Sequence, residues 1–355
     1  MIDSWGKLKG HEEQRALFQR SMNLGRLSHA YVLVGPEGIG KRLFARLLAQ
    51  SVFCRRHELS ELQVCGECRA CRAFTANAWP DYIEIGVPEG KNTIPISAIA
   101  GEDGKRGREG LCYELSMAPQ ASERRVAVIN DAQKMNAESA NALLKTLEEP
   151  PADSLILLVC DNADTLLPTI RSRCQIVRFF PLSATHVQEI LHEEELVEEE
   201  EEASSIAALC EGSLETARQL LNPDLRQMKA SVARQLGQME DMKPQQISAK
   251  VIERVEEISS STAEQRQNTQ WLLRFVADNI RDRLNKLAKG DLADPLTQKL
   301  GAKNGVDLLA PMLECTIAAS RQVDGSSPVK LVIEALFDEL ARQFRHAVKQ
   351  NSLGK

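Results

Sequence analysis

Short apolar runs rich in β-branched residues alternate with helical patterns in the first half of the chain. Alternation of this kind is typical of βαβ units, and it predicts an α/β domain with a mostly parallel sheet. Five runs of this kind are expected to form its strands. They are Ala30 to Val34, Asp81 to Ile85, Arg125 to Ile129, Ser154 to Val159 and Gln175 to Phe180.

A helix is predicted between the third and fourth of these strands. Its apolar residues recur at i, i+3, i+4 and i+7, and two consecutive prolines at positions 150 and 151 end it. We expect this apolar stripe to pack on the sheet. The residues that form the stripe are Ala140, Leu143, Leu144 and Leu147.

After Pro181 the strand signals stop, and the remaining pattern is helical. We predict a domain boundary near Pro181 and a second one near Pro223, which gives domains over residues 1–180, 181–223 and 224–355. The last two are expected to be all-α, a small helical domain followed by a helical bundle. The two clearest apolar faces of the bundle are Leu272, Phe275, Val276, Ile280, Leu284 and Leu287, and Ile333, Leu336, Phe337, Leu340 and Phe344.

The composition is that of an ordinary globular protein, with 43% hydrophobic and 26% charged residues. A formal net charge of −6 and the lack of basic and aromatic residues clustered in sequence argue against a nucleic-acid-binding module. The sequence begins without the apolar run of a signal peptide, and no later run is long enough to span a membrane. We therefore expect a cytoplasmic protein with no membrane association.

Two charged segments are predicted to be exposed. Residues 193–202 contain eight glutamates interrupted only by Leu196 and Val197. A block of like charges repels itself, so the simplest interpretation is a solvated helix end or loop. Residues 101–110, GEDGKRGREG, are rich in glycine and charge and are expected to form a loop.

The segment GPEGIGK follows the first predicted strand and precedes a helix, which is the context of a phosphate-binding loop. Gly35, Gly38 and Gly40 would let backbone N–H groups close around phosphates, and Lys41 would reach the β- and γ-phosphates. Arg42 stands where a hydroxyl would bind Mg²⁺, and a guanidinium cannot do so. Two interpretations remain: a vestigial site that binds ATP or ADP, and a glycine-rich turn without a ligand.

The run VAVIND, residues 126–131, has the pattern of a strand that ends in a Walker B element. Such an element supplies an Asp for Mg²⁺ and a Glu that orients water, but here those positions hold Asn130 and Asp131. A neutral amide binds Mg²⁺ poorly, and Asp131 is one methylene shorter than Glu. Metal and positioning supply nearly all of phosphoryl-transfer catalysis, so the sequence argues against hydrolysis.

Four of the nine cysteines are clustered in sequence, Cys54, Cys65, Cys68 and Cys71. Four thiolates at this spacing favour a closed, tetrahedral structural zinc site within residues 54–71. Reduced free thiols and an iron–sulfur cluster are the alternatives. The other cysteines are isolated and are interpreted as small buried hydrophobic residues. They are Cys112, Cys160, Cys174, Cys210 and Cys315.

Ser172, Arg173 and Cys174 lie between the fourth and fifth predicted strands. From these residues alone, Arg173 is better interpreted as a surface or ion-paired residue than as a catalytic one.

Taken together, the motifs resemble the bacterial clamp-loader AAA+ subunits of DNA polymerase III. The resemblance covers about residues 1–220, and it rests on the combination of motifs, since the phosphate-binding loop alone is common. The helical remainder is similar only in length and character. The matching segments are LSHAYVLVGPEGIGK, the four-cysteine module, WPDYIEI, NALLKTLEEPP, TIRSRCQIVRF and CEGSLETA.

The resemblance implies an AAA+ P-loop domain, a helical lid and an all-α collar. ATP-hydrolysing γ/τ members of this family have Lys-Thr in the loop and Asp-Glu in Walker B, whereas this sequence has Lys41-Arg42 and Asn130-Asp131. Glu215 stands where an active member commonly has a phosphate-sensing Arg. These departures are those of the non-hydrolysing δ′ type, and a γ/τ-type ATPase is the alternative.

The resemblance also implies a role for Arg173, as an arginine finger that acts in trans on a neighbour's ATP. The implied partners are γ/τ and δ subunits in a hetero-pentamer, which opens a sliding clamp and loads it on primer-template DNA. These roles come from the family and not from the composition or spacing of this chain.

Overall fold

The computed structural model describes residues 5–237, 243–259, 261–289, 295–325 and 327–353 of the 355-residue chain. The chain forms two compact units, Met1–Arg218 and Gln219–Lys355. The finer division into three domains stays a prediction.

The first unit is built on a five-stranded sheet whose neighbouring strands are all parallel, in the order β2-β3-β4-β1-β5. All five predicted strands are confirmed, and the fifth ends two residues earlier than predicted. Phe179 still donates its N–H to the carbonyl of Val34, at 2.6 Å. The strands are β1 Ala30–Val34, β2 Tyr82–Ile85, β3 Arg125–Ile129, β4 Ser154–Cys160 and β5 Gln175–Arg178.

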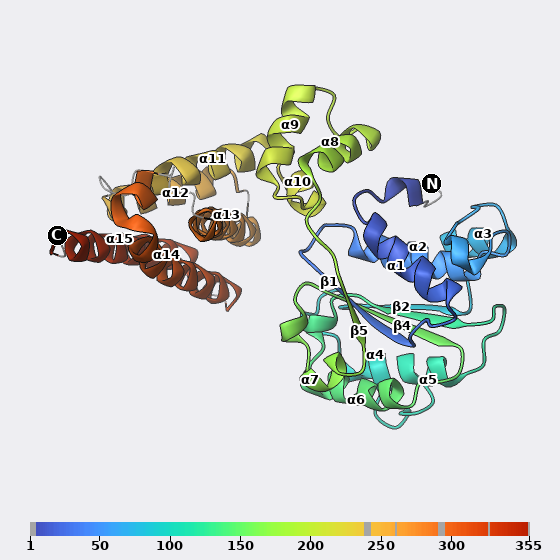
Figure 1. Ribbon diagram of the computed structural model, residues 1–355. Helices are drawn as coiled ribbons and strands as arrows, with labels where there is room; N and C mark the ends of the chain where they lie inside the picture. Colours follow the sequence, from blue (N-terminus) through green and yellow to red (C-terminus); the bar gives the residue numbers. More distant parts are fainter. Residues whose placement is uncertain (1–4, 238–242, 260, 290–294, 326, 354–355) are drawn as a thin grey trace. The chain divides into compact units, whose positions relative to one another are not determined.

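Helices cover both faces of this sheet, as Figure 1 shows. Alternate residues of a strand point to opposite faces, so Tyr31 and Leu33 pack with Phe18 and Phe44 on one face. Their neighbours along β1 pack on the other face with residues such as Leu143. The first face carries α1 Glu12–Asn23, α2 Lys41–Phe53 and α3 Arg69–Thr75, and the second α4 Ile96–Ala100, α5 Leu111–Ser116, α6 Ala137–Glu148 and α7 Pro168–Arg171.

The predicted amphipathic helix is α6. The side chain of Asn136 caps its start by accepting a hydrogen bond from the Ser139 N–H at 2.8 Å. Of the predicted stripe, Ala140, Leu143 and Leu147 are buried and the remaining leucine is half-buried. Burial of this stripe on the sheet stabilises the helix more than its propensity alone would.

Three helices complete the first unit: α8 Ala184–Glu193, α9 Glu200–Leu209 and α10 Leu214–Gln219. The acidic run forms the end of α8, a turn and the start of α9, and its glutamates are exposed except for the half-buried Glu202. The loop 101–110 is exposed between its two end glycines. Both predictions are therefore confirmed. Short 3-10 helices lie at Trp5–Lys7, Leu59–Glu61, Ala132–Lys134 and Ala163–Thr165.

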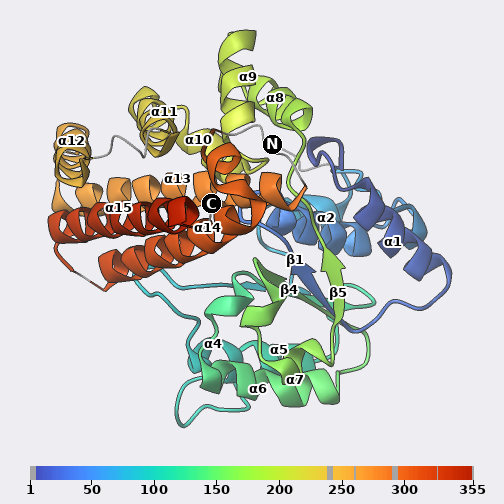
Figure 2. The ribbon, with the colours of Figure 1, turned by 60° about the vertical axis from the view of Figure 1, so that its left-hand side comes forward.

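The described part of the second unit is helical, as predicted. In Figure 2, α13, α14 and α15 run alongside one another. Every residue of the two predicted apolar faces is buried except Leu284, which is half-buried. The helices are α11 Pro223–Gly237, α12 Pro244–Glu257, α13 Thr262–Ala288, α14 Pro295–Asp324 and α15 Val329–Leu353.

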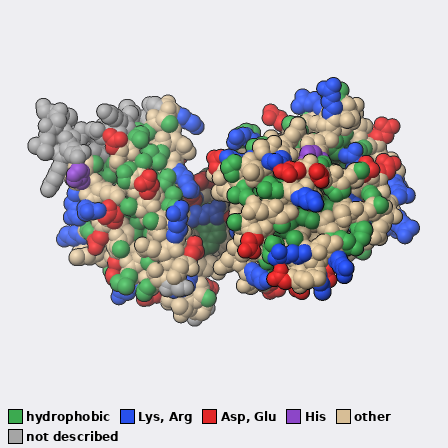
Figure 3. Space-filling view, turned by 90° about the horizontal axis from the view of Figure 1, so that it is seen from below, with side chains coloured by type: hydrophobic (Ala, Val, Ile, Leu, Met, Phe, Trp, Pro, Cys, Tyr) green, Lys and Arg blue, Asp and Glu red, His purple; other side chains and the backbone are tan. Residues whose placement is uncertain are grey.

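Charged side chains of both signs are interspersed on the face of each unit that Figure 3 shows. Among the described helices, none is long and apolar enough to cross a bilayer.

Candidate nucleotide-binding site and cysteine cluster

The glycine-rich loop connects β1 to α2, at the edge of the sheet where the parallel strands have their carboxyl ends. Strand β1 lies between β4 and β5, so the strand order reverses beside it. Ligands of open α/β sheets bind at such a switch point. The loop therefore occupies the expected position for a phosphate site.

A cavity of about 390 Å³ adjoins the loop, and we call it the P-loop cavity. Its lining carries five acidic and four basic side chains, and the acidic ones work against binding of a polyphosphate. The acidic residues are Glu37, Asp131, Asp161, Glu194 and Glu215, and the basic ones are Lys7, Lys41, Arg42 and Arg218.

The backbone of the loop requires its glycines. Gly38 and Gly40 have φ values of +76° and +97°, which side chains other than glycine rarely adopt. At Gly35 a Cβ would lie 2.4 Å from the carbonyl oxygen of Phe179. The three glycines predicted from the motif are thus needed for the loop to fold against β5, whether or not it binds a ligand.

Lys41 is buried, and its amine is turned back onto its own loop. Nζ donates to the carbonyls of Gly35 at 2.5 Å and Pro36 at 2.6 Å, and to Oδ1 of Asp161 at 3.0 Å. An ammonium has three donors, so these contacts satisfy all of them. A phosphate would have to replace at least one of these partners before Lys41 could bind it.

The positions that would hold Mg²⁺ are occupied by internal contacts. Arg42 forms an ion pair with Asp131, so the guanidinium neutralises the carboxylate that stands nearest to a Walker B ligand. Asn130 donates through Nδ2 to Oε1 of Glu84 at 2.7 Å. Its own Oδ1 is buried and has no hydrogen-bond partner among the described residues.

Glu84 is a site residue that the sequence interpretation did not single out. It lies on β2, and its Oε2 accepts hydrogen bonds from Arg46 at 2.7 Å and from the Tyr82 hydroxyl at 2.8 Å. Burial and the adjacent Glu84 carboxylate raise the pKa of Tyr82. Because three donors hold this carboxylate, it is not free to orient a water for attack on phosphate.

Helix α10 closes over the loop. The N–H of Leu214 donates to the carbonyl of Gly38 at 2.8 Å, and a Cβ on Gly38 would meet Ser213 and Glu215 at 2.5 and 2.7 Å. Glu215 lines the P-loop cavity as expected from its position in the motif. A carboxylate at this position repels phosphate, whereas an arginine would attract it.

Arg173 lies at the amino ends of the parallel strands, whereas the loop lies at their carboxyl ends. It precedes β5, whereas the loop follows β1, and these two strands are parallel. Its Nη2 pairs with Oε1 of Glu148 at 2.5 Å, and Nη1 donates to the Thr169 carbonyl at 3.0 Å. The side chain is 33% exposed. The geometry therefore separates Arg173 from every other predicted nucleotide-site residue, so it cannot act on this chain's own loop.

The four clustered cysteines come together in space. Their Sγ atoms all lie within 4.8 Å of one another. The Sγ of Cys65 accepts a hydrogen bond from the Cys68 N–H at 3.3 Å, and the Sγ of Cys68 accepts one from the Cys71 N–H at 3.4 Å. Hydrogen bonds of this kind stabilise thiolates. Four converging sulfurs fit a tetrahedral Zn²⁺, so the cluster can bind this ion.

The thiols of this cluster have perturbed acidities. Burial raises the pKa of Cys68, but hydrogen bonds from the Arg55 and Cys71 N–H groups oppose it and bring the value down to about 6. Burial and the neighbouring Cys68 thiol raise the pKa of Cys71. The cluster therefore contains a sulfur that ionises readily, as a metal ligand must.

The five isolated cysteines differ in their burial, whereas all five were predicted to be buried. Cys160 and Cys210 are buried, but Cys112, Cys174 and Cys315 are only half-buried, so that part of the prediction was wrong. Cys112 lies on α5 and Cys315 on α14, and Cys174 lies in a bend just before β5. Burial still raises the pKa of Cys174 to about 12, which keeps it a protonated, weakly reactive thiol at neutral pH.

An all-parallel sheet with a glycine-rich loop at its switch point defines a P-loop type α/β domain. Within it, residues 10–183 match the family described as DNA polymerase III, delta subunit. This region of the chain is similar to that family.

The curated relatives agree with this family. The chain is 34% identical over 220 residues to DNA polymerase III subunit delta′ of Pseudomonas aeruginosa, covering 62% of this chain and 63% of the relative. It is 33% identical to the delta′ subunit of Bacillus subtilis, and this match covers 55% of this chain and 56% of the relative. Subunit tau of Escherichia coli is 30% identical, covering 65% of this chain and 35% of the relative. These matches span less than two thirds of each relative's length.

Solved structures of lower similarity also match. The Thermotoga maritima RuvB Holliday junction branch migration motor has a TM-score of 0.41 at 20% identity, over 65% of this chain and 66% of the other. A DNA polymerase III gamma subunit-related protein of the same organism has a TM-score of 0.43 at 17% identity, over 92% of this chain and 99% of the other.

Proposed function

We propose that this chain is a δ′-type subunit of a DNA polymerase III clamp loader that hydrolyses no ATP itself. It assembles with γ/τ and δ subunits in the cytoplasm and supplies Arg173 to a neighbouring subunit, so that the complex loads a sliding clamp on primed DNA. The observation that carries the proposal is the internal ion pair of Arg42 with Asp131, at the position where a motor subunit binds Mg²⁺.

The loss of metal ligands is the main argument against hydrolysis. Mg²⁺ would meet a guanidinium at Arg42 and an amide at Asn130, and the carboxylate of Asp131 is already neutralised by Arg42. Hydrolysis of ATP relies on the metal to balance charge on the phosphates. Without it, we expect the rate to fall by several orders of magnitude.

Binding of a nucleotide without hydrolysis is weakened but not abolished by this geometry. A nucleotide would have to break contacts of Lys41 and enter a cavity with a carboxylate at Glu215. In return, the loop offers backbone N–H groups at the start of α2. We therefore propose at most weak binding of ATP or ADP.

Arg173 is suited to act on another subunit. It lies away from its own P-loop cavity, and it is held by an exposed ion pair with Glu148 that contributes only about 0–1 kcal/mol to stability. A guanidinium held so weakly can exchange its partner for a neighbour's phosphate at little cost. An arginine finger accelerates phosphoryl transfer by about 10³- to 10⁵-fold.

We further propose that the cysteine cluster binds one structural Zn²⁺. The ion would be held by Cys54, Cys65, Cys68 and Cys71, with no position left for a catalytic water. Zinc bound in this way ties the start of α3 to the end of α2 and contributes folding free energy.

Turnover of ATP by the isolated chain tests the proposal directly. Because Arg42 and Asn130 leave Mg²⁺ without its two usual protein ligands, we expect a rate equal to background in the purified chain. Lys41→Ala is the control, since it removes the loop amine and should change nothing. A rate of about 1 s⁻¹ that disappears in Lys41→Ala would favour the alternative, a γ/τ-type motor.

A further inference from the structure

A groove of about 510 Å³ lies in the second unit between α13 and α14. On α13, Trp271, Arg274 and Arg281 follow one another at intervals of three and seven residues, which puts them on one side of the helix. On α14, Arg321 lies one turn beyond Ile317 and completes the same groove. Because Arg321 comes from a distant segment, this basic and aromatic cluster could not be predicted from the sequence.

The side chains that line the groove carry a positive charge, although the formal net charge of the whole chain is −6. Its described lining contains three arginines and no carboxylate. The nearby Asp278 is buried and lies 3.2 Å from Arg281 and 3.9 Å from Arg274. Arg321 is exposed and has no ion-pair partner among the described residues. The carboxylate of Asp324 accepts a hydrogen bond from Gln270 of the groove at 2.8 Å. Among the described residues, Asp278 and Asp324 therefore compensate the positive charge of the groove only in part.

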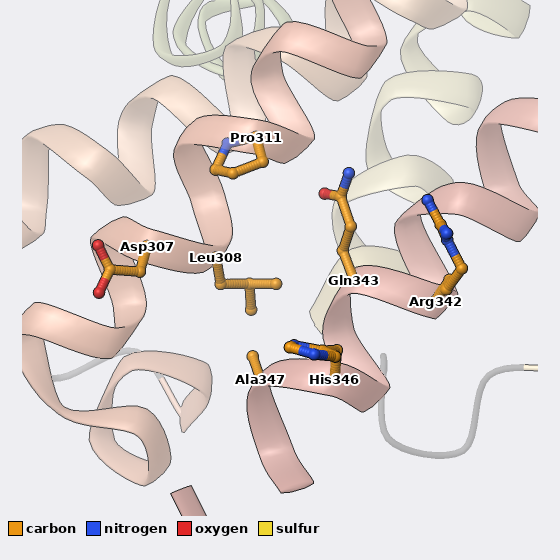
Figure 4. Close-up of a pocket in the computed structure, with 7 residues that line it drawn as sticks. All are labelled: Asp307, Leu308, Pro311, Arg342, Gln343, His346 and Ala347. Carbon is orange, nitrogen blue, oxygen red and sulfur yellow. The ribbon is translucent and has the colours of Figure 1, made fainter. Parts of the chain in front are cut away.

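A flat aromatic surface lies within this positive groove. The Arg274 guanidinium stacks over the Trp271 ring at 5.0 Å, and the ring is partly exposed. Indole rings and guanidinium planes both stack on unpaired bases. By contrast, the described lining of a second cavity between α14 and α15 includes Asp307, Arg342 and His346, and its only aromatic ring is the imidazole (Figure 4).

We infer that the groove between α13 and α14 binds a short segment of single-stranded nucleic acid, with bases on the Trp271–Arg274 stack and phosphates on Arg281 and Arg321. The combination favours this ligand over an acidic peptide, because carboxylates need the arginines but gain little from the partly exposed ring. The inference does not depend on the ATPase or arginine-finger proposals.

Fluorescence anisotropy of the full chain with labelled (dT)15 tests this inference, and labelled (rU)15 distinguishes DNA from RNA. We expect saturable binding. The double variant Arg281→Gln, Arg321→Gln should weaken it about tenfold or more and lower the slope of log Kd on log salt by about 1.4, the value for two phosphate contacts. Trp271→Leu should weaken it about 5- to 100-fold, and Trp271→Phe should retain most of the affinity.

The matched control is Arg342→Gln, Arg345→Gln on α15, which removes the same charge and should bind as the parent does. Thermal unfolding identifies any variant that has lost its fold. If Trp271→Leu is unfolded, the affinity of Trp271→Phe tests the stacking of bases instead. Equal affinity of the two double variants would overturn the inference. So would absence of saturable binding, or displacement of (dT)15 by oligoglutamate at equal concentration, which would make the groove a site for acidic peptides.

Discussion

Asp81 shows how a single buried residue organises the edge of the sheet beside β2. It is fully buried and accepts hydrogen bonds from the N–H groups of Gln120, Ala121 and Ser122 at 2.7 to 2.8 Å. Burial alone would raise the pKa of Asp81. Hydrogen bonds from the Ser122 hydroxyl and from these N–H groups outweigh burial, so the pKa lies below its ordinary value. The carboxylate therefore fixes the turn that leads into β3.

Asp81→Asn should lower the free energy of unfolding by about 2–4 kcal/mol, because an NH₂ group would face backbone donors and the buried charge opposite Arg125 would be lost. Urea unfolding followed by circular dichroism measures the change. Asp103→Asn is the control, since this carboxylate is 92% exposed and should cost less than about 0.5 kcal/mol. A similar loss in both variants would contradict this account of Asp81.

His11 makes stability depend on pH. Its Nε2 lies 2.6 Å from the Ile39 carbonyl beside the loop, and the ring is buried. Burial lowers its pKa below 6.5, and the nearby His186 adds to this, while the Ile39 carbonyl and Glu12 oppose it. Well above pH 6.5 the ring is neutral in both the folded and the unfolded chain. Below it, the unfolded chain binds the proton first, so this residue destabilises the fold as pH falls.

His11→Gln should therefore reduce the loss of stability between pH 6.5 and pH 5, by up to about 1.4 kcal/mol per pH unit. Glutamine can still donate to the Ile39 carbonyl. The measurement is the urea midpoint across this range, and the control is His57→Gln, at a half-buried histidine outside the loop. An identical pH slope in the parent and His11→Gln would show that another group is responsible.

At the scale of elements, α2, the cysteine cluster and α3 form one continuous structure. Cys54 ends α2, and Cys68 caps α3 by accepting a hydrogen bond from the Cys71 N–H. Cys65 lies between them in the intervening loop. A bound metal would therefore connect two helices that pack on the same face of the sheet.

Cys68→Ser should remove the metal while keeping an oxygen acceptor for the helix cap. We expect metal content to fall from about one Zn²⁺ per chain to near zero and the Tm to fall by about 5 to 15 °C. Elemental analysis and calorimetry measure both. The control is Cys112→Ser, a thiol outside the cluster, which should retain the metal. A reduced, folded parent chain without zinc would refute the proposal.

The strands and the main helices could be predicted because burial on both faces of a parallel sheet gives apolar runs, and burial on one face gives a helical stripe. The loop glycines and the four cysteines could be found from spacing. Glu84, Asp161 and Glu148 could not, because their importance comes from partners distant in sequence: Asn130, Lys41 and Arg173. Spacing along the chain carries no information about such contacts.

At the scale of the whole molecule, the two units have different chemistry. The first contains the P-loop cavity at the carboxyl ends of the strands and Arg173 at their amino ends, and the cysteine cluster lies between α2 and α3. The described part of the second is helical and contains the positive groove. We propose that Arg173 acts on the ATP of a neighbouring subunit, which is the role that the family resemblance implies.

Clamp loading by a complex reconstituted from this chain and candidate γ/τ and δ subunits tests that claim most directly. Arg173→Ala should leave assembly intact and lower DNA-stimulated ATP hydrolysis and clamp loading by at least about tenfold. Arg173→Lys should recover little, because it loses the planar fork that contacts two oxygens. Glu148→Gln removes the same ion pair and should load clamps as the parent does. Equal effects of Arg173→Ala and Glu148→Gln, or unchanged loading with a lower Tm, would contradict the account.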